Sequence, residues 1–149
     1  MQKLLMSLFV LSFSQCAKAD SISTQIYSTD DTPRLIGQIR FEDSNKGLLI
    51  YPDLKALTPG SHGMHIHEKP SSDQHGDAAG AHLDPMQSKS HRGPYLQGHL
   101  GDLPVLTVDA EGRATLPVIA PNLSIKNIKN HSIVIHEKGD NYSDTPPLG

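Results

Sequence analysis

The histidines of this chain are concentrated in one stretch, and this concentration constrains the fold more than any other feature. Seven of the nine histidines lie between His62 and His99, and another, His136, follows further along the chain. Imidazole is the commonest protein ligand for copper and zinc. We therefore expect segments that are far apart in the sequence to meet around bound metal.

A first set of candidate ligands contains the pair His65 and His67. Alternate side chains of a β-strand lie on one face, so both rings can reach the same ion. His136 ends another expected strand and can approach the same point across the sheet. Three or four imidazoles without a thiolate suit Cu(II).

A second set contains His91, His99 and Asp102. His99 and Asp102 are three positions apart, which is close enough for both to bind one ion at a turn. Three nitrogens and one carboxylate form a closed tetrahedral zinc site. His82 lies between the two sets, and because an imidazole has two nitrogens, its ring can bind both metals.

The remaining histidines are given structural or solvent-exposed roles. We expect His62 to form a hydrogen bond to a loop, His75 to be a solvated loop residue and His131 to be structural. Asp140 follows His136 by four positions. Because a metal-bound histidine usually needs a carboxylate behind its ring, we expect Asp140 to fill that role.

From Asp20 onward, short apolar stretches alternate with turn residues. Turns such as Asp43-Ser44-Asn45-Lys46-Gly47 and Asp109-Ala110-Glu111-Gly112 separate these stretches. The pattern predicts strands at residues 22–27, 35–41, 48–54, 60–67, 103–108, 114–119 and 132–136. Many short strands joined by tight turns are typical of an all-β sandwich or barrel.

Residues 68–101 interrupt this pattern. They are rich in Gly, Ser, Asp, His and Pro and show no sustained period. A loop this long inside a compact domain is usually functional or disordered, and its histidines favour a functional loop that metal keeps in order. The one helix that the pattern suggests is short, at residues 123–129.

Length and composition exclude several classes of protein. The 149 residues suit a single domain. No segment reaches the roughly 18 consecutive apolar residues of a membrane span. A nucleic-acid partner is not expected, because the chain has no basic run and only four Tyr, three Phe and no Trp.

The first residues resemble an export signal. Lys3 provides a positive start, residues 4–13 are apolar, and Ala17-Lys18-Ala19 matches a small-x-small cleavage site. We expect residues 1–19 to be a signal peptide and residues 20–149 to be a periplasmic or secreted domain. That domain has 11 Lys and Arg against 16 Asp and Glu, a formal charge of −5. The alternatives are a buried N-terminal helix and a lipid anchor on Cys16, although Phe13-Ser14-Gln15 fits a lipoprotein signal poorly.

Taken together, these motifs resemble the copper/zinc superoxide dismutase family, especially its bacterial periplasmic branch. The resemblance extends from about Ile22 to Gly149 and is carried by residues 60–68, 81–85, 91–94, 98–104 and 131–140. It implies an eight-stranded Greek-key β-barrel that binds copper and zinc. The implied reaction converts superoxide to dioxygen and hydrogen peroxide.

The resemblance also implies a role for each site residue. The implied copper ligands are His65, His67, His82 and His136. The implied zinc ligands are His82, His91, His99 and Asp102. His82 is shared and is the implied catalytic residue, which exchanges a proton during turnover, and Asp140 is the acid that links a copper-ligand ring to a zinc-ligand ring.

Two features of that family are absent from this sequence. In the family, a Pro-Leu-Gly like Pro147-Leu148-Gly149 leads into a last strand with an arginine beside the copper and a cysteine. The cysteine that would pair with it is replaced by Ser71 and Ser72, and Cys16 is the only cysteine here. We therefore expect no disulfide, a fold without the last strand and slower turnover. The exposed edges favour either an incomplete barrel or a homodimer.

Two other functions share some of these residues. A non-catalytic periplasmic copper/zinc-binding protein would keep the ligands without the arginine, and turnover with both metals bound distinguishes it. A cupin-type dioxygenase also uses His-x-His on a barrel. It needs a glutamate several residues further on, whereas Glu68 follows His67 directly, and it binds iron.

Overall fold

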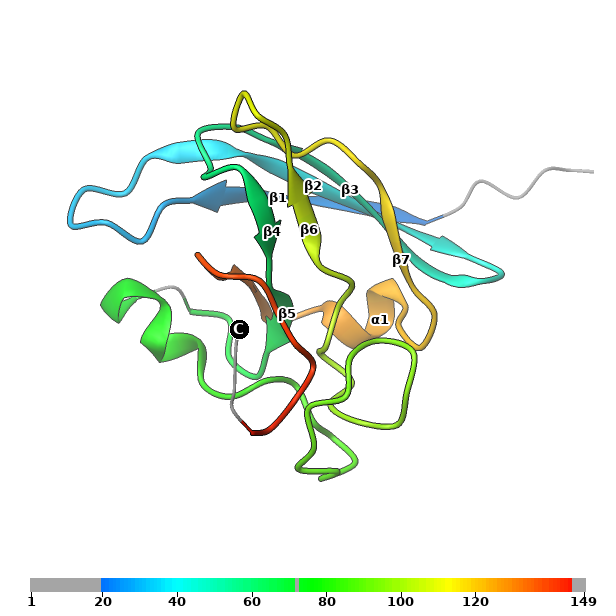
Figure 1. Ribbon diagram of the computed structural model, residues 1–149. Helices are drawn as coiled ribbons and strands as arrows, with labels where there is room; N and C mark the ends of the chain where they lie inside the picture. Colours follow the sequence, from blue (N-terminus) through cyan, green and yellow to red (C-terminus); the bar gives the residue numbers. More distant parts are fainter. Residues whose placement is uncertain (1–19, 72, 146–149) are drawn as a thin grey trace, which may run out of the picture.

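The computed structural model describes residues 20–71 and 73–145. A twisted sheet lies at the top of Figure 1, with shorter strands and long loops below it. The expected signal peptide with Cys16, and the Pro147-Leu148-Gly149 segment, lie outside the described residues. In the described part of the chain, no helix is long and apolar enough to cross a membrane.

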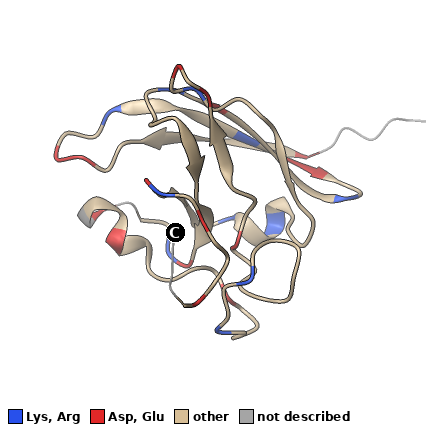
Figure 2. Ribbon diagram, viewed as in Figure 1, with Lys and Arg blue, Asp and Glu red and all other residues tan. Residues whose placement is uncertain are grey.

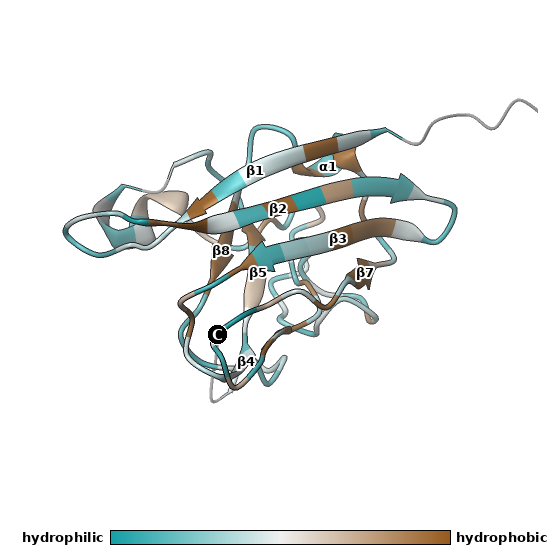
Figure 3. Ribbon diagram, turned by 90° about the horizontal axis from the view of Figure 1, so that it is seen from above, coloured by the Kyte–Doolittle hydropathy of each residue, from teal (hydrophilic) through white to brown (hydrophobic). Residues whose placement is uncertain are grey.

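The main sheet is antiparallel. It contains β1 (Ser21–Tyr27), β2 (Leu35–Ser44), β3 (Gly47–Leu54) and β7 (Val118–Ala120), in the order β1-β2-β3-β7. Along β3 every second residue is buried, including Leu48, Ile50 and Leu54, as expected for a strand with one face on the core. Figure 3 shows apolar and polar residues interspersed along β2, and an apolar stretch followed by a polar end along β3.

Two short strand pairs form the layer that packs against this sheet. β4 (Gly60–His62) pairs with β6 (Leu106–Val108), and β5 (Met64–His67) pairs with β8 (Ser132–Ile135). The core lies between the layers and includes these fully buried side chains: Ile39, Leu48, Ile50, Met64, Ile66, Leu103 and Leu106. The prediction of an all-β fold is confirmed.

A cavity of about 1330 Å³ lies between β1 and β8. Its apolar lining includes Ile26, Phe41, Ile66, Ile133 and Ile135. Within the described residues, β1 pairs only with β2 and β8 only with β5. Each of these two strands therefore has one edge without a strand partner in the described part of the chain.

The expected single strand at residues 60–67 is in fact two strands. It is interrupted at Gly63, whose N–H donates to Lys138 O (2.7 Å) and whose carbonyl accepts from His136 N (2.8 Å). The chain therefore leaves β6 as its partner and takes up β8 instead. This change of partner brings the His136 segment alongside His65 and His67.

Other boundaries also differ from the sequence prediction. β6 begins only at Leu106, three residues late, after Pro104, which has no N–H to donate. The strand expected at 114–119 is reduced to β7 and an isolated bridge between Leu54 and Ala114, with Pro117 between them. The expected helix is limited to α1 (Ile125–Ile128).

The expected loop at residues 68–101 contains one regular element. The 3-10 helix η1 (Gln74–Ala79) forms within it. His75 and Gly76 have positive φ values of 58° and 98° inside this helix. A helix this short and irregular leaves no helical period in the sequence. The prediction of an irregular loop is wrong for these residues.

Gly101 lies where three ligand-bearing segments meet. Its carbonyl accepts from Ile66 N (2.9 Å), its N–H donates to Leu83 O (2.9 Å), and Leu83 N donates to Ile66 O (2.8 Å). A Cβ at position 101 would overlap Ile66 O and lie 2.9 Å from Leu83 N. Only glycine fits there without moving the backbone of β5 or of the His82 segment.

We therefore expect Gly101→Ala to lower the free energy of unfolding by about 3 kcal/mol, the upper part of the range for overpacked sites. Urea unfolding of the metal-free protein measures this. Gly139→Ala is a matched control, because the nearest atom to its Cβ would be Ser61 O at 3.3 Å. Equal stability of the two variants would contradict the prediction.

Candidate metal centre

Four imidazoles converge at the end of β5. The ligand atoms of His65, His67, His82 and His136 all lie within 4.8 Å of one another. His65 and His67 are alternate residues of β5, and His136 directly follows the paired strand β8. His82 joins them because it forms an isolated bridge with His67. The structure therefore brings together all four residues of the first expected set.

Hydrogen bonds fix which nitrogen of each β5 ring faces the others. Nε2 of His65 lies 2.6 Å from Asp140 Oδ2, and Nδ1 of His67 lies 2.8 Å from Gly80 O. Each ring therefore donates outward and turns its other nitrogen inward. These inward atoms, His65 Nδ1 and His67 Nε2, are buried with no hydrogen-bond partner among the described residues, as is His136 Nε2.

A carboxylate is the centre of the second group. Oδ1 of Asp102 lies 3.1 Å from His82 Nδ1, 2.9 Å from His91 Nδ1 and 3.4 Å from His99 Nδ1. Ligands about 2.0 Å from a tetrahedral ion would be roughly 3.3 Å apart. The other oxygen, Oδ2, accepts from the backbone N–H of Arg92 and of Gly93. This geometry matches a closed zinc site.

Distance alone also places His65 in the second group, with His82, His91 and Asp102. The reason is that the His65 ring stacks on the His82 ring, with centroids 3.9 Å apart. Nε2 of His65 already faces Asp140. Nδ1 of His65 faces the first group, whereas His99 Nδ1 is buried 3.4 Å from Asp102 Oδ1, so the chemistry favours His99 as the fourth member.

Asp140 connects the two groups. Its Oδ2 faces His65 Nε2 at 2.6 Å, and its Oδ1 faces His91 Nε2 at 2.7 Å. The side chain has no exposed surface. Burial opposes its ionisation, but hydrogen bonds from Tyr142 N and from the two rings outweigh burial, and the pKa of Asp140 is lowered. The expected contact of this acid with a ring of each set is thus present.

Burial also controls the protonation of the histidines. Desolvation, with the neighbouring imidazoles, lowers the pKa of His65 to about 3 and that of His136 to about 4. Burial raises the pKa of Asp102, but the hydrogen bond with His82 and the nearby charge of His91 outweigh it, so the pKa is about 2. At neutral pH these three groups are therefore in the protonation state that binds metal.

These shifts predict acid sensitivity of the metal-free protein. Between pH 6.5 and pH 4, His136 becomes protonated in the unfolded chain but not in the folded chain. Because the unfolded state binds more protons, the free energy of unfolding decreases as the pH is lowered. We expect a loss of about 3 kcal/mol from His136 over this range, and His65 adds to it. His91, whose pKa is raised, acts in the opposite sense and loses its contribution only as pH rises.

Urea unfolding of metal-free protein at pH 6.5, 5 and 4 measures this dependence. His136→Gln, which cannot titrate, serves as the matched variant and should show a shallower decrease. Identical pH profiles for the two proteins would contradict the prediction.

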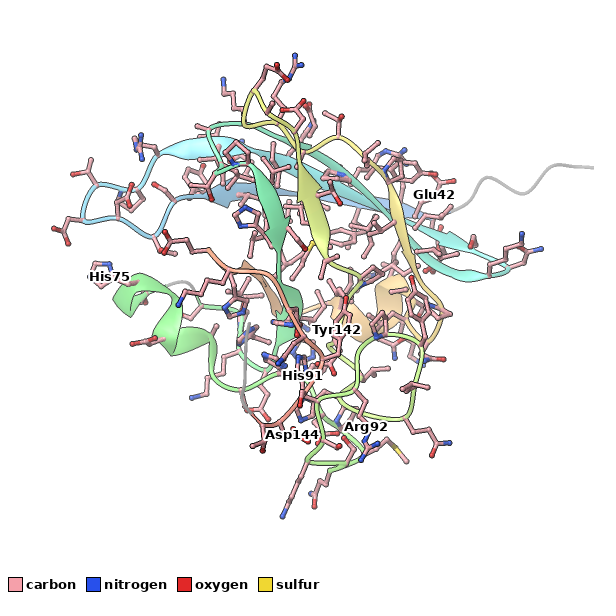
Figure 4. The ribbon with its side chains drawn as sticks, viewed as in Figure 1. Glu42, His75, His91, Arg92, Tyr142 and Asp144 are labelled. Atoms are coloured by element: carbon pink, nitrogen blue, oxygen red, sulfur yellow. The ribbon has the colours of Figure 1, made fainter. Side chains whose placement is uncertain are left out.

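The other three histidines lie outside both groups. His62 is buried, and its ring nitrogens face His136 O and Thr58 O, each at 2.7 Å. His131 Nδ1 faces Glu68 O at 2.8 Å. His75 is exposed, on η1 and far from the metal centre in Figure 4. The expected structural roles of His62 and His131 and the expected exposure of His75 agree with these positions.

Sequence reasoning missed two residues that contact the second group. Tyr142 and Asp144 follow Asp140 at alternate positions, and in Figure 4 both lie beside His91. The Tyr142 hydroxyl donates to Leu103 O and accepts from Val105 N. Burial raises the pKa of Tyr142 to about 12, so it donates at neutral pH. The alternate spacing of polar residues after Asp140 was the available signal.

Comparison with known proteins identifies this arrangement. The family model described as copper/zinc superoxide dismutase matches residues 35–149. The chain belongs to the copper/zinc superoxide dismutase family. A Superoxide dismutase [Cu-Zn] from Legionella pneumophila is 45% identical over 137 residues, which cover 92% of this chain and 85% of the relative.

Solved structures of the family give the same result for the fold. The Cu/Zn superoxide dismutase from Brucella abortus aligns with a TM-score of 0.81 and 37% identity, covering 87% of this chain and 92% of that one. The monomeric enzyme from Salmonella enterica aligns with a TM-score of 0.72 and 43% identity, covering 86% and 92%. The architecture is the Greek-key β-barrel type of the copper/zinc superoxide dismutases.

Proposed function

We propose that this protein is a superoxide dismutase in which the first group holds copper and the second holds zinc. The assigned copper ligands are His65, His67, His82 and His136. The assigned zinc ligands are His82, His91, His99 and Asp102. The proposal rests on five buried ring nitrogens that all belong to these two sets. Three of them have no hydrogen-bond partner in the described chain, and Nδ1 of His91 and of His99 face the Asp102 carboxylate.

The donor types support a different metal in each group. The first group offers imidazole nitrogens and no carboxylate or thiolate, which suits copper. The second offers three Nδ1 atoms that lie 2.9 to 3.4 Å from one carboxylate oxygen, and three imidazole nitrogens with one carboxylate suit zinc. His82 belongs to both, because its Nδ1 faces Asp102 and its Nε2 remains for the first group.

Bound copper supplies the one-electron chemistry by which one superoxide is oxidised to dioxygen and a second is reduced to hydrogen peroxide. The second product needs two protons. We assign delivery of one of them to His82, the catalytic residue, whose Nε2 would hold either the copper or the proton and never both at once. Its side chain is 18% exposed, while those of His65 and Asp102 are fully buried. Asp102 keeps that ring oriented through its Nδ1.

The substrate is an anion, whereas the formal charge of the whole chain is −3. In Figure 2, basic and acidic residues are spread over strands, both short helices and loops, and the basic residues do not gather in one place in this view. We therefore assign the attraction of superoxide mainly to the charge of the bound metals, which are the largest local charges in such a site.

The decisive experiment compares dismutation by the protein loaded with copper and zinc and by the same protein loaded with zinc alone. A copper-dependent rate far above the zinc-only rate supports the proposal. Stoichiometric binding of both metals without a copper-dependent rate would instead identify a non-catalytic metal-binding protein.

We also propose that the enzyme is exported and acts in the periplasm or outside the cell. The export-signal pattern of residues 1–19 supports this. Mass spectrometry of the protein recovered from its native compartment should find a chain that begins at Asp20. A lipid-modified Cys16 at the N-terminus would contradict this cleavage site.

We further propose that two copies associate through the outer edges of β1 and β8. Both edges lack a strand partner in the described part of the chain, and such edges favour pairing with another chain. The relative from Salmonella enterica is described as monomeric, so this property would distinguish the two proteins. Sedimentation equilibrium tests it, and a well-folded monomer would contradict it.

A further inference from the structure

Residues 140–144, called the clamp segment below, contact the second group through three alternate side chains. Asp140 reaches the rings of His65 and His91. Tyr142 and Asp144 reach other parts of the loops that carry the second group. In Figure 4 the labelled side chains of His91, Tyr142 and Asp144 lie together where the clamp segment crosses the loop around His91.

Tyr142 joins two segments that carry different members of the group. Its hydroxyl donates to Leu103 O (3.0 Å) and accepts from Val105 N (2.9 Å). Both partners belong to the segment that follows Asp102. Its ring covers Gly93, two residues after His91, so closely that a Cβ on Gly93 would lie 2.8 Å from Tyr142 Cγ. Gly93 N in turn donates to Asp102 Oδ2 (3.1 Å).

Asp144 holds the backbone of the same loop from the other side. Its Oδ1 accepts from His91 N (2.8 Å), and its Oδ2 accepts from Ser90 Oγ (3.3 Å). His91 is therefore held at its ring by Asp140 and at its backbone by Asp144. The His91 and Tyr142 rings are also in contact, with centroids 5.9 Å apart.

We propose that Tyr142 and Asp144 are positioning residues that set the zinc affinity of the second group by holding His91 and Asp102 at ligand spacing. The inference rests on the proposed zinc site. Second-layer partners of metal ligands typically change metal affinity by 10- to 100-fold. In the described structure neither side chain is seen in contact with His65, His67 or His136, so we expect the effect mainly on zinc.

The test uses Tyr142→Phe, which keeps the ring and removes both hydroxyl hydrogen bonds. Tyr95→Phe is the matched control, because Tyr95 lies on the same loop two residues after Gly93 and is 65% exposed. Zinc affinity of the full chain is measured by chelator competition, and copper affinity is measured in parallel. The visible spectrum of Co²⁺ bound in place of zinc reports the ligand geometry directly.

We expect Tyr142→Phe to weaken zinc binding about 10-fold, to speed zinc release and to change the Co²⁺ spectrum, while copper affinity and the Tyr95→Phe control stay at wild-type values. Asp144→Ala provides a second test on an exposed residue that is not part of the core. The alanine side chain accepts neither the hydrogen bond from His91 N nor that from Ser90 Oγ, so zinc affinity should again fall.

Two results would overturn the inference. One is wild-type zinc affinity and an unchanged Co²⁺ spectrum in both variants. The other is an equal loss of copper and zinc, which would indicate a general role in folding. Failure of the wild-type protein to bind zinc at all would overturn the proposed zinc site and the inference with it, and the wild-type titration alone identifies that case.

Discussion

His136→Ala is expected to reduce copper-dependent dismutation at least 100-fold and to leave one zinc per chain in place. Nε2 of His136 is one of the buried nitrogens without a hydrogen-bond partner among the described residues. Loss of a partner behind a ligand already costs 10- to 100-fold, so loss of a ligand itself should cost more. The second group does not include His136, and its zinc should therefore stay bound.

The measurement is turnover together with the content of both metals in the same sample. His131→Ala is the matched control: it removes another imidazole at the opposite end of β8, whose Nδ1 contacts only a backbone carbonyl, that of Glu68, in the described structure. The control should keep its copper and its activity. Full activity of His136→Ala, or loss of zinc along with copper, would refute the assignment of the two groups.

The identity of the candidate ligands could be read from the sequence because residue type and local spacing carry that information. His65 and His67 are alternate residues of one strand, so a common face followed from the period of two. His99 and Asp102 are three positions apart at a turn, and His99 Nδ1 lies 3.4 Å from Asp102 Oδ1. His82 was expected between the sets, and the structure places it in both.

Strand partners could not be read in the same way, because they depend on contacts far apart in the sequence. The interruption at Gly63 is produced by hydrogen bonds to Lys138 and His136, more than 70 residues away. The strand expected at 103–108 is shortened by Pro104, which has no N–H to donate, and by a distant contact beside the second group, where Leu103 O accepts from Tyr142. Local propensity contains no trace of these contacts.

The same reason explains why Asp140 was expected and Tyr142 was not. A metal-bound imidazole needs a carboxylate, so chemistry predicts an acid near the ligands. Tyr142 acts on the backbone of Leu103 and Val105 and on the surface of Gly93. Its partners are peptide groups that every residue has, and only the folded chain shows which of them it meets.

Asp140→Asn is expected to weaken copper binding 10- to 100-fold and to affect zinc less. Oδ1 of Asp140 faces two donors, Tyr142 N at 2.7 Å and His91 Nε2 at 2.7 Å. The asparagine oxygen should take this position, because an NH₂ group there would face two donors. The NH₂ group then faces Nε2 of His65, which is 2.6 Å from Oδ2 in the wild-type protein.

This orientation forces a change of tautomer in His65. Nε2 must accept a hydrogen bond instead of donating one, so the proton of the neutral ring moves to Nδ1. That atom is the buried nitrogen that faces the first group, and a protonated nitrogen cannot bind a metal. His91 keeps its acceptor, so the second group is disturbed only indirectly. The substitution is nearly isosteric, and the prediction therefore rests on one proton rather than on packing.

Competition titrations with each metal measure the two affinities separately. Asp109→Asn is the matched control, because it makes the same chemical change in an exposed turn where Asp109 accepts from Glu111 N and Arg113 N. Copper affinity at the wild-type value would contradict the tautomer argument. A larger loss of zinc than of copper would mean that the side-chain amide takes the opposite orientation, with its NH₂ group toward His91. In that case the backbone N–H of Tyr142 would not determine the orientation of the amide.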